Sequence, residues 1–146
     1  MKVTLVLLLL IALSTACGSA SSSKPADLPH GESANWKITI LSATRGELPA
    51  SANVRGTHLN VELTAEYVGT AKDAPFETVT ASAGAKELKY VSYSGNIMER
   101  MQGKKYNETY SFDDPGPEAS QFALKYGDVA PINFGLMAKK NTNANR

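Results

Sequence analysis

The chain contains short stretches in which apolar and polar residues alternate. The longest of them, THLNVELTAEY, keeps this alternation from Thr57 to Tyr67. A period of two residues is typical of a β-strand that is buried on one face and open to solvent on the other. The inward phase consists of Leu59, Val61, Leu63, Ala65 and Tyr67. The outward phase, which we expect to face solvent, consists of His58, Asn60, Glu62, Thr64 and Glu66.

The same period recurs along the rest of the chain, in WKITIL, KYNETYSF, SQFALKY and APINFGLM, and more weakly in FETVTAS. KELKYVSY is a further candidate strand, in which we expect Tyr90 and Tyr93 to lie on opposite faces. About seven short strands with Gly and Pro between them predict an all-β fold, an antiparallel β-sandwich over residues 35–138. The stretch GNIMERMQG is the exception, because it suits a single helical turn. The expected core consists of Trp36, Leu59, Val61, Leu63, Phe112, Phe122, Leu124, Ile132 and Phe134.

The chain begins with a segment that suits export rather than the sandwich. Lys2 provides a positive start, and the apolar run from Val3 to Leu13 follows, with Thr4 as its only polar residue. This run of about 11 residues is too short for a transmembrane helix, which needs about 20, but it has the length of a signal-peptide core. We therefore expect residues 1–16 to be a signal peptide.

The leader ends on Ser14-Thr15-Ala16-Cys17, and Cys17 is the only cysteine of the 146 residues. This ending resembles the lipobox of bacterial lipoproteins, although a leucine is commoner than serine at position 14. The resemblance implies that the thiol of Cys17 carries a covalent lipid, and Gly18 in place of aspartate implies sorting to the outer membrane. An ordinary signal peptide that is cut nearby and leaves a free thiol is the alternative. No other cofactor is expected.

Residues 17–34 are expected to be a flexible linker behind the lipidated cysteine. They are rich in Ser, with Pro25 and Pro29, and Leu28 is the only large aliphatic residue among them. Such a segment buries too little apolar surface to offset the entropy lost on ordering. His30 is interpreted as part of this solvated linker, and residues 139–146 as a polar tail.

The order of the strand candidates carries a second resemblance. WKITILSA is followed by GTHLNVELTAEYVG, AGAKELKYV, QGKKYNETYSFDDPG and FALKYGDVAPINFGL. This series resembles the immunoglobulin-like domain of many uncharacterised bacterial lipoproteins and of related secreted mycobacterial antigens, from Trp36 to Leu136. Phe112-Asp-Asp-Pro115 is similar to the Phe-x-x-Pro turn of that family. The resemblance implies an immunoglobulin-like sandwich, and it implies no enzyme activity and no catalytic residue.

Charge and histidine content bear on the class of function. The net charge is +1, and removal of residues 1–16 takes away Lys2 and no acid, which leaves 14 basic against 14 acidic side chains. A neutral chain carries no electrostatic signature of nucleic-acid binding. The two histidines are His30 and His58, and no Gly-x-Ser-x-Gly motif is present. A catalytic triad would have to use His58, and zinc would lack ligands, so we expect no enzyme.

Three groups of residues are candidates for binding. Asp113, Asp114 and Glu118 form an acidic turn with the oxygen ligands that Ca²⁺ prefers, but Asp before Pro-Gly is also what a turn requires. Tyrosines suit interfaces because they combine an apolar ring with a hydroxyl group, although strand tyrosines also lie at core margins. Lysines near them would form a basic rim, or would only keep a strand edge soluble. The candidate partner-binding residues are Tyr90, Tyr93, Lys89, Lys104 and Lys105.

The sequence thus favours a lipid-anchored, non-catalytic binding module of the cell envelope that engages a protein partner. One variant of this hypothesis is an immunity-type protein that neutralises a toxin in the periplasm. A structural envelope lipoprotein without a specific ligand is the alternative. The expected location is a membrane to which the lipid holds the protein, namely the outer membrane, facing the periplasm or the cell surface.

Overall fold

The computed structural model describes residues 27–48, 54–95 and 105–138. These residues form strands, turns and loops without any helix, so none of them belongs to a helix long and apolar enough to cross a membrane. The signal peptide, Cys17, the expected helical turn of GNIMERMQG, Lys104 and the polar tail lie outside the described residues.

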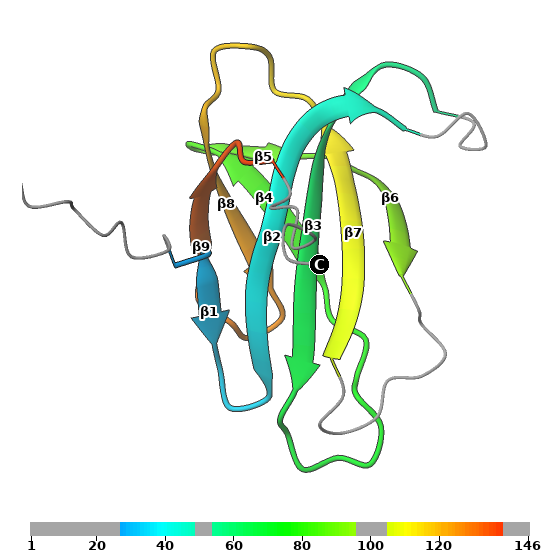
Figure 1. The fold of residues 1–146 in the computed structure, drawn as a ribbon, viewed down its shortest axis with the longest axis vertical. Helices are drawn as coiled ribbons and strands as arrows, with labels where there is room; N and C mark the ends of the chain where they lie inside the picture. The colour runs from blue at the N-terminus through cyan, green and yellow to red at the C-terminus, as the bar shows by residue number, and fades with distance from the viewer. Residues whose placement is uncertain (1–26, 49–53, 96–104, 139–146) are drawn as a thin grey trace, which may run out of the picture.

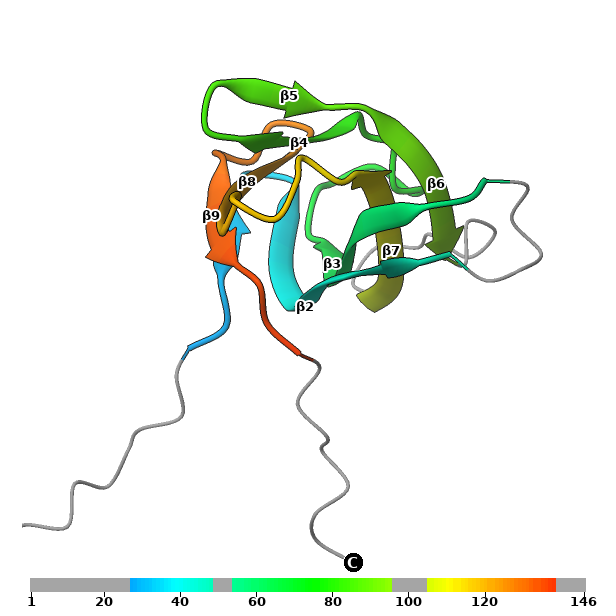
Figure 2. The same cartoon turned by 90° about the horizontal axis from the view of Figure 1, so that it is seen from above.

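In the described residues, nine strands form two antiparallel sheets. The two sheets pack face to face (Figure 1 and Figure 2). The first sheet has the order β1-β2-β3-β7-β6 and consists of β1 (His30–Glu32), β2 (Trp36–Glu47), β3 (Thr57–Tyr67), β7 (Lys105–Asp113) and β6 (Tyr90–Gly95). The second sheet has the order β5-β4-β8-β9 and consists of β5 (Lys86–Leu88), β4 (Val79–Ala83), β8 (Gln121–Tyr126) and β9 (Ile132–Gly135).

This strand order is that of an immunoglobulin domain. β2, β3, β7 and β6 take the places of strands A, B, E and D, and β5, β4, β8 and β9 take those of C′, C, F and G. β1 is an additional edge strand beside β2. The expected immunoglobulin-like sandwich is therefore confirmed, with nine strands in the described residues instead of about seven.

The core lies between the sheets and consists of the in-phase residues of each strand. Every member of the expected core is buried, with Trp36 at its centre. The indole of Trp36 packs against the rings of Tyr67 and Tyr126, each with a centroid separation of 5.1 Å. The alternation of apolar residues thus identifies the inner face, because burial of these large side chains supplies most of the free energy of folding.

Two expectations about the strands are wrong in detail. The linker does not extend to residue 34, because His30–Glu32 pairs with β2 as β1. Gly31 allows this pairing: a Cβ at this position would lie 2.8 Å from Cγ1 of Ile132, so only glycine lets β1 pack closely over the end of β9. KELKYVSY is not one strand, because the chain leaves the second sheet after Leu88 and enters the first at Tyr90.

His58 and Leu136 also differ from expectation. His58 is on the outer face of β3, as its phase predicts, but it is only 4% exposed. β3 is a central strand between β2 and β7, and a side chain on a central strand is shielded by neighbours on both sides. Leu136 continues the alternation of Ile132 and Phe134 in APINFGLM, but it is exposed because β9 ends at Gly135.

Candidate functional site

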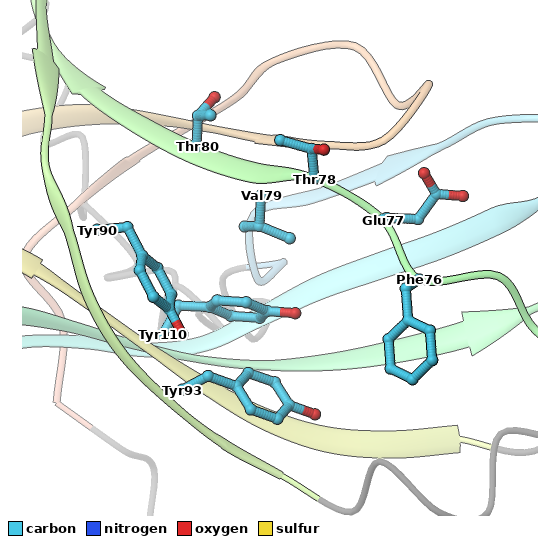
Figure 3. A pocket seen from close by; sticks show the side chains of 8 residues that line it. All are labelled: Phe76, Glu77, Thr78, Val79, Thr80, Tyr90, Tyr93 and Tyr110. Carbon is cyan, nitrogen blue, oxygen red and sulfur yellow. The ribbon is translucent and has the colours of Figure 1, made fainter.

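An open cleft lies where the two sheets diverge, between the β4 side of the second sheet and the β6 edge of the first. Its volume is 470 Å³. Figure 3 shows β4 with the segment before it on one side and the tyrosines of β6 and β7 on the other. The lining residues are Phe76, Glu77, Thr78, Val79, Thr80, Tyr90, Tyr93 and Tyr110.

A β-bulge brings the two candidate tyrosines of β6 to this cleft. Tyr90 pairs with Phe112, whereas Tyr93 pairs with Tyr110, and the register shifts between Tyr90 and Ser92. One extra residue, Val91, therefore lies between the two pairs, and an extra residue reverses the alternation of the strand. Tyr90 and Tyr93 lie on the same face as a result, and the expectation that they lie on opposite faces is wrong.

Behind the tyrosines that line the cleft, a buried carboxylate accepts hydrogen bonds from tyrosine hydroxyls. Glu108 of β7 is 1% exposed. The Tyr93 hydroxyl donates to its Oε1 at 3.1 Å, and the hydroxyls of Tyr110 and Tyr126 donate to its Oε2 at 3.1 Å and 3.2 Å. A buried carboxylate is costly unless donors surround it, and these hydroxyls supply them. The network ties β6, β7 and β8 together across the sandwich.

Tyr110 is the central residue of this network. Its ring packs against those of Tyr93 and Tyr126, at centroid separations of 5.1 Å and 6.4 Å. Burial raises the pKa of Tyr110 far above its ordinary value of 10.0, and the neighbouring Glu108 carboxylate and Tyr126 raise it further. The Tyr110 hydroxyl therefore keeps its proton throughout the physiological range and acts as a donor to Glu108.

The rim of the cleft presents aromatic rings to solvent. Phe76 is 73% exposed and Tyr90 is 50% exposed. The segment that carries Phe76 is held by its neighbour Glu77, whose Oε1 accepts a hydrogen bond from Nε1 of the buried Trp36 at 2.9 Å. The Tyr90 ring packs edge-on against Phe112, at a centroid separation of 6.4 Å. Both rings of the rim are thus displayed by segments that contact the core.

The structure separates the candidate lysines. Lys89 lies between β5 and β6, and its carbonyl accepts a hydrogen bond from the backbone N–H of Asp113 at the end of β7. Lys105 lies at the opposite end of β7, where its Nζ is 3.3 Å from Oε2 of Glu66. Eight residues of extended strand separate Asp113 from Lys105, which corresponds to about 26 Å. Neither Lys89 nor Lys105 lines the cleft.

The acidic turn that carries Asp113, Asp114 and Glu118 is bound by Arg45 of the same chain. The Nε of Arg45 donates to Oδ1 of Asp114 at 2.9 Å, and its Nη2 donates to the carbonyls of Gly116 and Ala119. Asp114 also accepts the backbone N–H of Gly116 at 3.1 Å, as expected for an Asp that begins a turn. Asp113 and Glu118 are exposed. Within the described residues, no group of at least three His, Cys, Asp or Glu side chains is placed to hold a metal ion.

His58 makes no hydrogen bond through either ring nitrogen. A catalytic histidine needs an acceptor that orients its ring, and neither ring nitrogen of His58 has such a partner in the described part of the chain. His30 is exposed, and its Nδ1 lies 3.0 Å from the carbonyl oxygen of Leu28.

Sequence reasoning found Tyr90 and Tyr93 but missed Phe76, Tyr110 and Glu108. Glu108 carried a signal, because it is the one charged residue in phase with Tyr106, Tyr110 and Phe112 on an otherwise apolar face. Phe76 carried none: it begins the weak strand candidate FETVTAS, but β4 starts only at Val79, so Phe76 lies in the loop before it. No protein-family profile, no curated protein and no solved structure matches this chain.

Proposed function

We propose that this protein is a non-catalytic binding module of the cell envelope, lipid-anchored through Cys17, that engages a protein partner through the aromatic cleft. The observation that carries the proposal is the pair of exposed rings, Phe76 and Tyr90, at the rim of a concave surface. Exposed aromatic side chains around a hollow are typical of interaction sites, because each ring offers a large apolar area at a small entropic cost.

The anchor rests on the lipobox-like ending of the leader, and the chain length fits it. Twelve residues lie between Cys17 and His30, where β1 begins. At about 3.5 Å per residue, this segment extends at most about 45 Å. An anchor of this reach confines the search for a partner to a thin layer near the membrane and raises the effective concentration of both. The outer membrane remains the proposed location, with Gly18 behind the cysteine.

A photo-crosslinking amino acid at position 90 tests the proposal in intact cells. The matched control carries the same amino acid at Glu66, which lies on the outer face of the first sheet, away from the cleft. We expect one envelope protein to be crosslinked from position 90 and not from position 66. The crosslink should weaken when Phe76 is replaced by serine in the same chain.

The same experiment separates the proposal from its alternatives. Equal crosslinking from positions 90 and 66, or none from either, would favour a structural lipoprotein without a specific ligand. If the captured protein is a toxin and deletion of the gene makes cells poison themselves, the immunity variant of the proposal applies.

A further inference from the structure

We propose that the aromatic cleft is a guanidinium site that takes an arginine side chain of the protein partner, an inference that rests on the proposed function. The one charged residue of its lining is Glu77. Val79 of β4 faces the tyrosines, whereas the side chains of Thr78 and Thr80 point the opposite way (Figure 3), so the hydroxyls available to a ligand are those of the tyrosines. None of the eight lining residues is Lys, Arg or His. The wall therefore carries one formal negative charge and no positive one, which complements a cation.

The hydroxyl network makes the floor of the cleft an acceptor surface. The proton of the Tyr110 hydroxyl is committed to Oε2 of Glu108. A hydroxyl that donates its proton keeps oxygen lone pairs, so Tyr110 can only accept a hydrogen bond from a ligand. Figure 3 shows the rings of Tyr110 and Tyr93 side by side, with their hydroxyl ends turned the same way. A ligand rich in donors and lacking acceptors suits this floor, and guanidinium is such a group.

The rings of the rim favour guanidinium over ammonium. The face of an aromatic ring is negative, and it attracts a cation placed within about 6 Å of its centre. Guanidinium is planar and weakly hydrated, so it stacks on a ring more readily than the strongly hydrated ammonium of lysine. Tyr90 and Phe76 offer such faces at the entrance, and the volume of 470 Å³ accommodates a complete arginine side chain with its neighbours.

The inference is tested with the protein purified in detergent as the cell makes it. The probes are Nα-acetyl-arginine amide and Nα-acetyl-citrulline amide, which have the same shape but differ in charge. Titration is followed by ligand-observed NMR. We expect the arginine probe to bind about tenfold more tightly than the citrulline probe, because only the former gains cation–π and charge interactions.

Paired variants show whether binding depends on the ring or the hydroxyl group of Tyr90, and whether it depends on the charge of Glu77. Tyr90→Leu removes the π face and should weaken arginine binding about tenfold, whereas Tyr90→Phe keeps the face and should bind like the parent. Glu77→Gln keeps an oxygen acceptor for Trp36 but removes the charge, so it should also weaken binding. Glu66→Gln, outside the cleft, is its matched control and should leave binding unchanged.

The possible outcomes separate this inference from the proposed function. If neither probe binds, if both bind equally, or if acetyl-lysine amide binds more tightly than the arginine probe, the guanidinium site is overturned. A partner that is still crosslinked from position 90 then leaves the proposed function standing. If the arginine probe binds in a Tyr90-dependent way but no protein is crosslinked, the proposed function is overturned, and with it a protein as the source of the guanidinium.

Discussion

Glu108 is an acidic residue that is buried on an otherwise apolar strand face. It lies on the inner face of β7, in phase with Tyr106, Tyr110 and Phe112, and its side chain is fully enclosed. Apolar burial alone would strongly disfavour a carboxylate there. Donation from three tyrosine hydroxyls offsets this cost, and it also fixes the positions of the rings that form the floor of the cleft.

We predict that Glu108→Gln destabilises the fold by about 1–3 kcal/mol, because a neutral amide accepts weaker hydrogen bonds and brings two donors among hydroxyls that already donate. The free energy of unfolding in urea measures this effect. Glu66→Gln is the control, since Glu66 belongs to a surface ion pair and its loss should cost less than about 1 kcal/mol. Equal stability of the two variants would show that the tyrosine network contributes nothing.

A second prediction concerns Tyr110 at alkaline pH. Burial and the Glu108 carboxylate raise the pKa of Tyr110 above its ordinary value of 10.0, so the folded chain keeps a proton that the unfolded chain releases. This contribution to stability is complete below about pH 10 and is lost progressively as the pH rises above it, at about 1.4 kcal/mol per pH unit.

Tyr110→Phe should therefore reduce the slope of unfolding free energy against pH by about one proton between pH 10 and 11.5. At pH 7 the same variant should be less stable than the parent by about 1–2 kcal/mol, because the donor to Glu108 is lost. Urea unfolding at a series of pH values gives both numbers. An unchanged slope would mean that the hydroxyl ionises alike in the folded and unfolded chains.

At the scale of the residue, the sequence identifies the core but not its exceptions. Trp36, Leu63 and Phe122 could be placed because large apolar side chains in strict phase have no other stable location. The burial of His58 on the outer face of β3 could not be predicted. Whether a polar residue is shielded depends on the strands that lie on either side of it, and one-dimensional periodicity does not contain that information.

At the scale of the element, β1 shows how a three-residue strand is held. It pairs with β2, and Gly31 lies directly against the side chains of Ile132 in β9 and of Val129 in the turn between β8 and β9. Seen from above, in Figure 2, β1 and β9 lie side by side and close one edge of the sandwich. The composition around His30 resembles a linker, so only the missing side chain of Gly31 hinted at this contact.

We predict that Gly31→Ala destabilises the fold by about 1–3 kcal/mol and exposes β1 to hydrogen exchange. The added Cβ would lie 2.8 Å from Cγ1 of Ile132 and 2.9 Å from Cγ1 of Val129, so one side must shift. Gly46→Ala is the matched control in β2, because the nearest atom to its Cβ would be Nδ2 of Asn60 at 3.8 Å. Loss of amide protection confined to β1 in the first variant would confirm the contact.

The bulge at Val91 is the reason that the sequence alone does not predict the cleft. The sequence supplies the two tyrosines of β6, but a strict period of two puts them on opposite faces. The strand crosses from one sheet to the other just before Tyr90, and the extra residue at Val91 accommodates this entry. Such a shift depends on the pairing partner, and Tyr110 of that partner is distant in sequence.

At the scale of the whole molecule, the chain enters the domain at one edge of the first sheet, and the cleft lies at the opposite edge. β1 occupies one edge and β6 the other, with β2, β3 and β7 between them. The chain enters the domain at β1, whereas the cleft is lined from β6. An anchor upstream of β1 would therefore attach at the edge of the first sheet opposite to the edge that lines the cleft. The two sheets need no covalent link for this arrangement, because Cys17 is the only cysteine.

The final prediction is that Cys17→Ala moves the protein from the membrane fraction to the soluble fraction without changing the domain. The first described strand begins at His30, well downstream of the cysteine, so the urea midpoint of the variant should equal that of the parent. One acyl chain binds a membrane only weakly, and stable attachment takes more than one, so complete retention of the parent in membranes would indicate multiple acylation. Intact-mass analysis of the parent should show the lipid on the fragment that contains Cys17. An unmodified thiol, or a variant that still pellets with membranes, would contradict the anchor while leaving the cleft and its arginine test untouched.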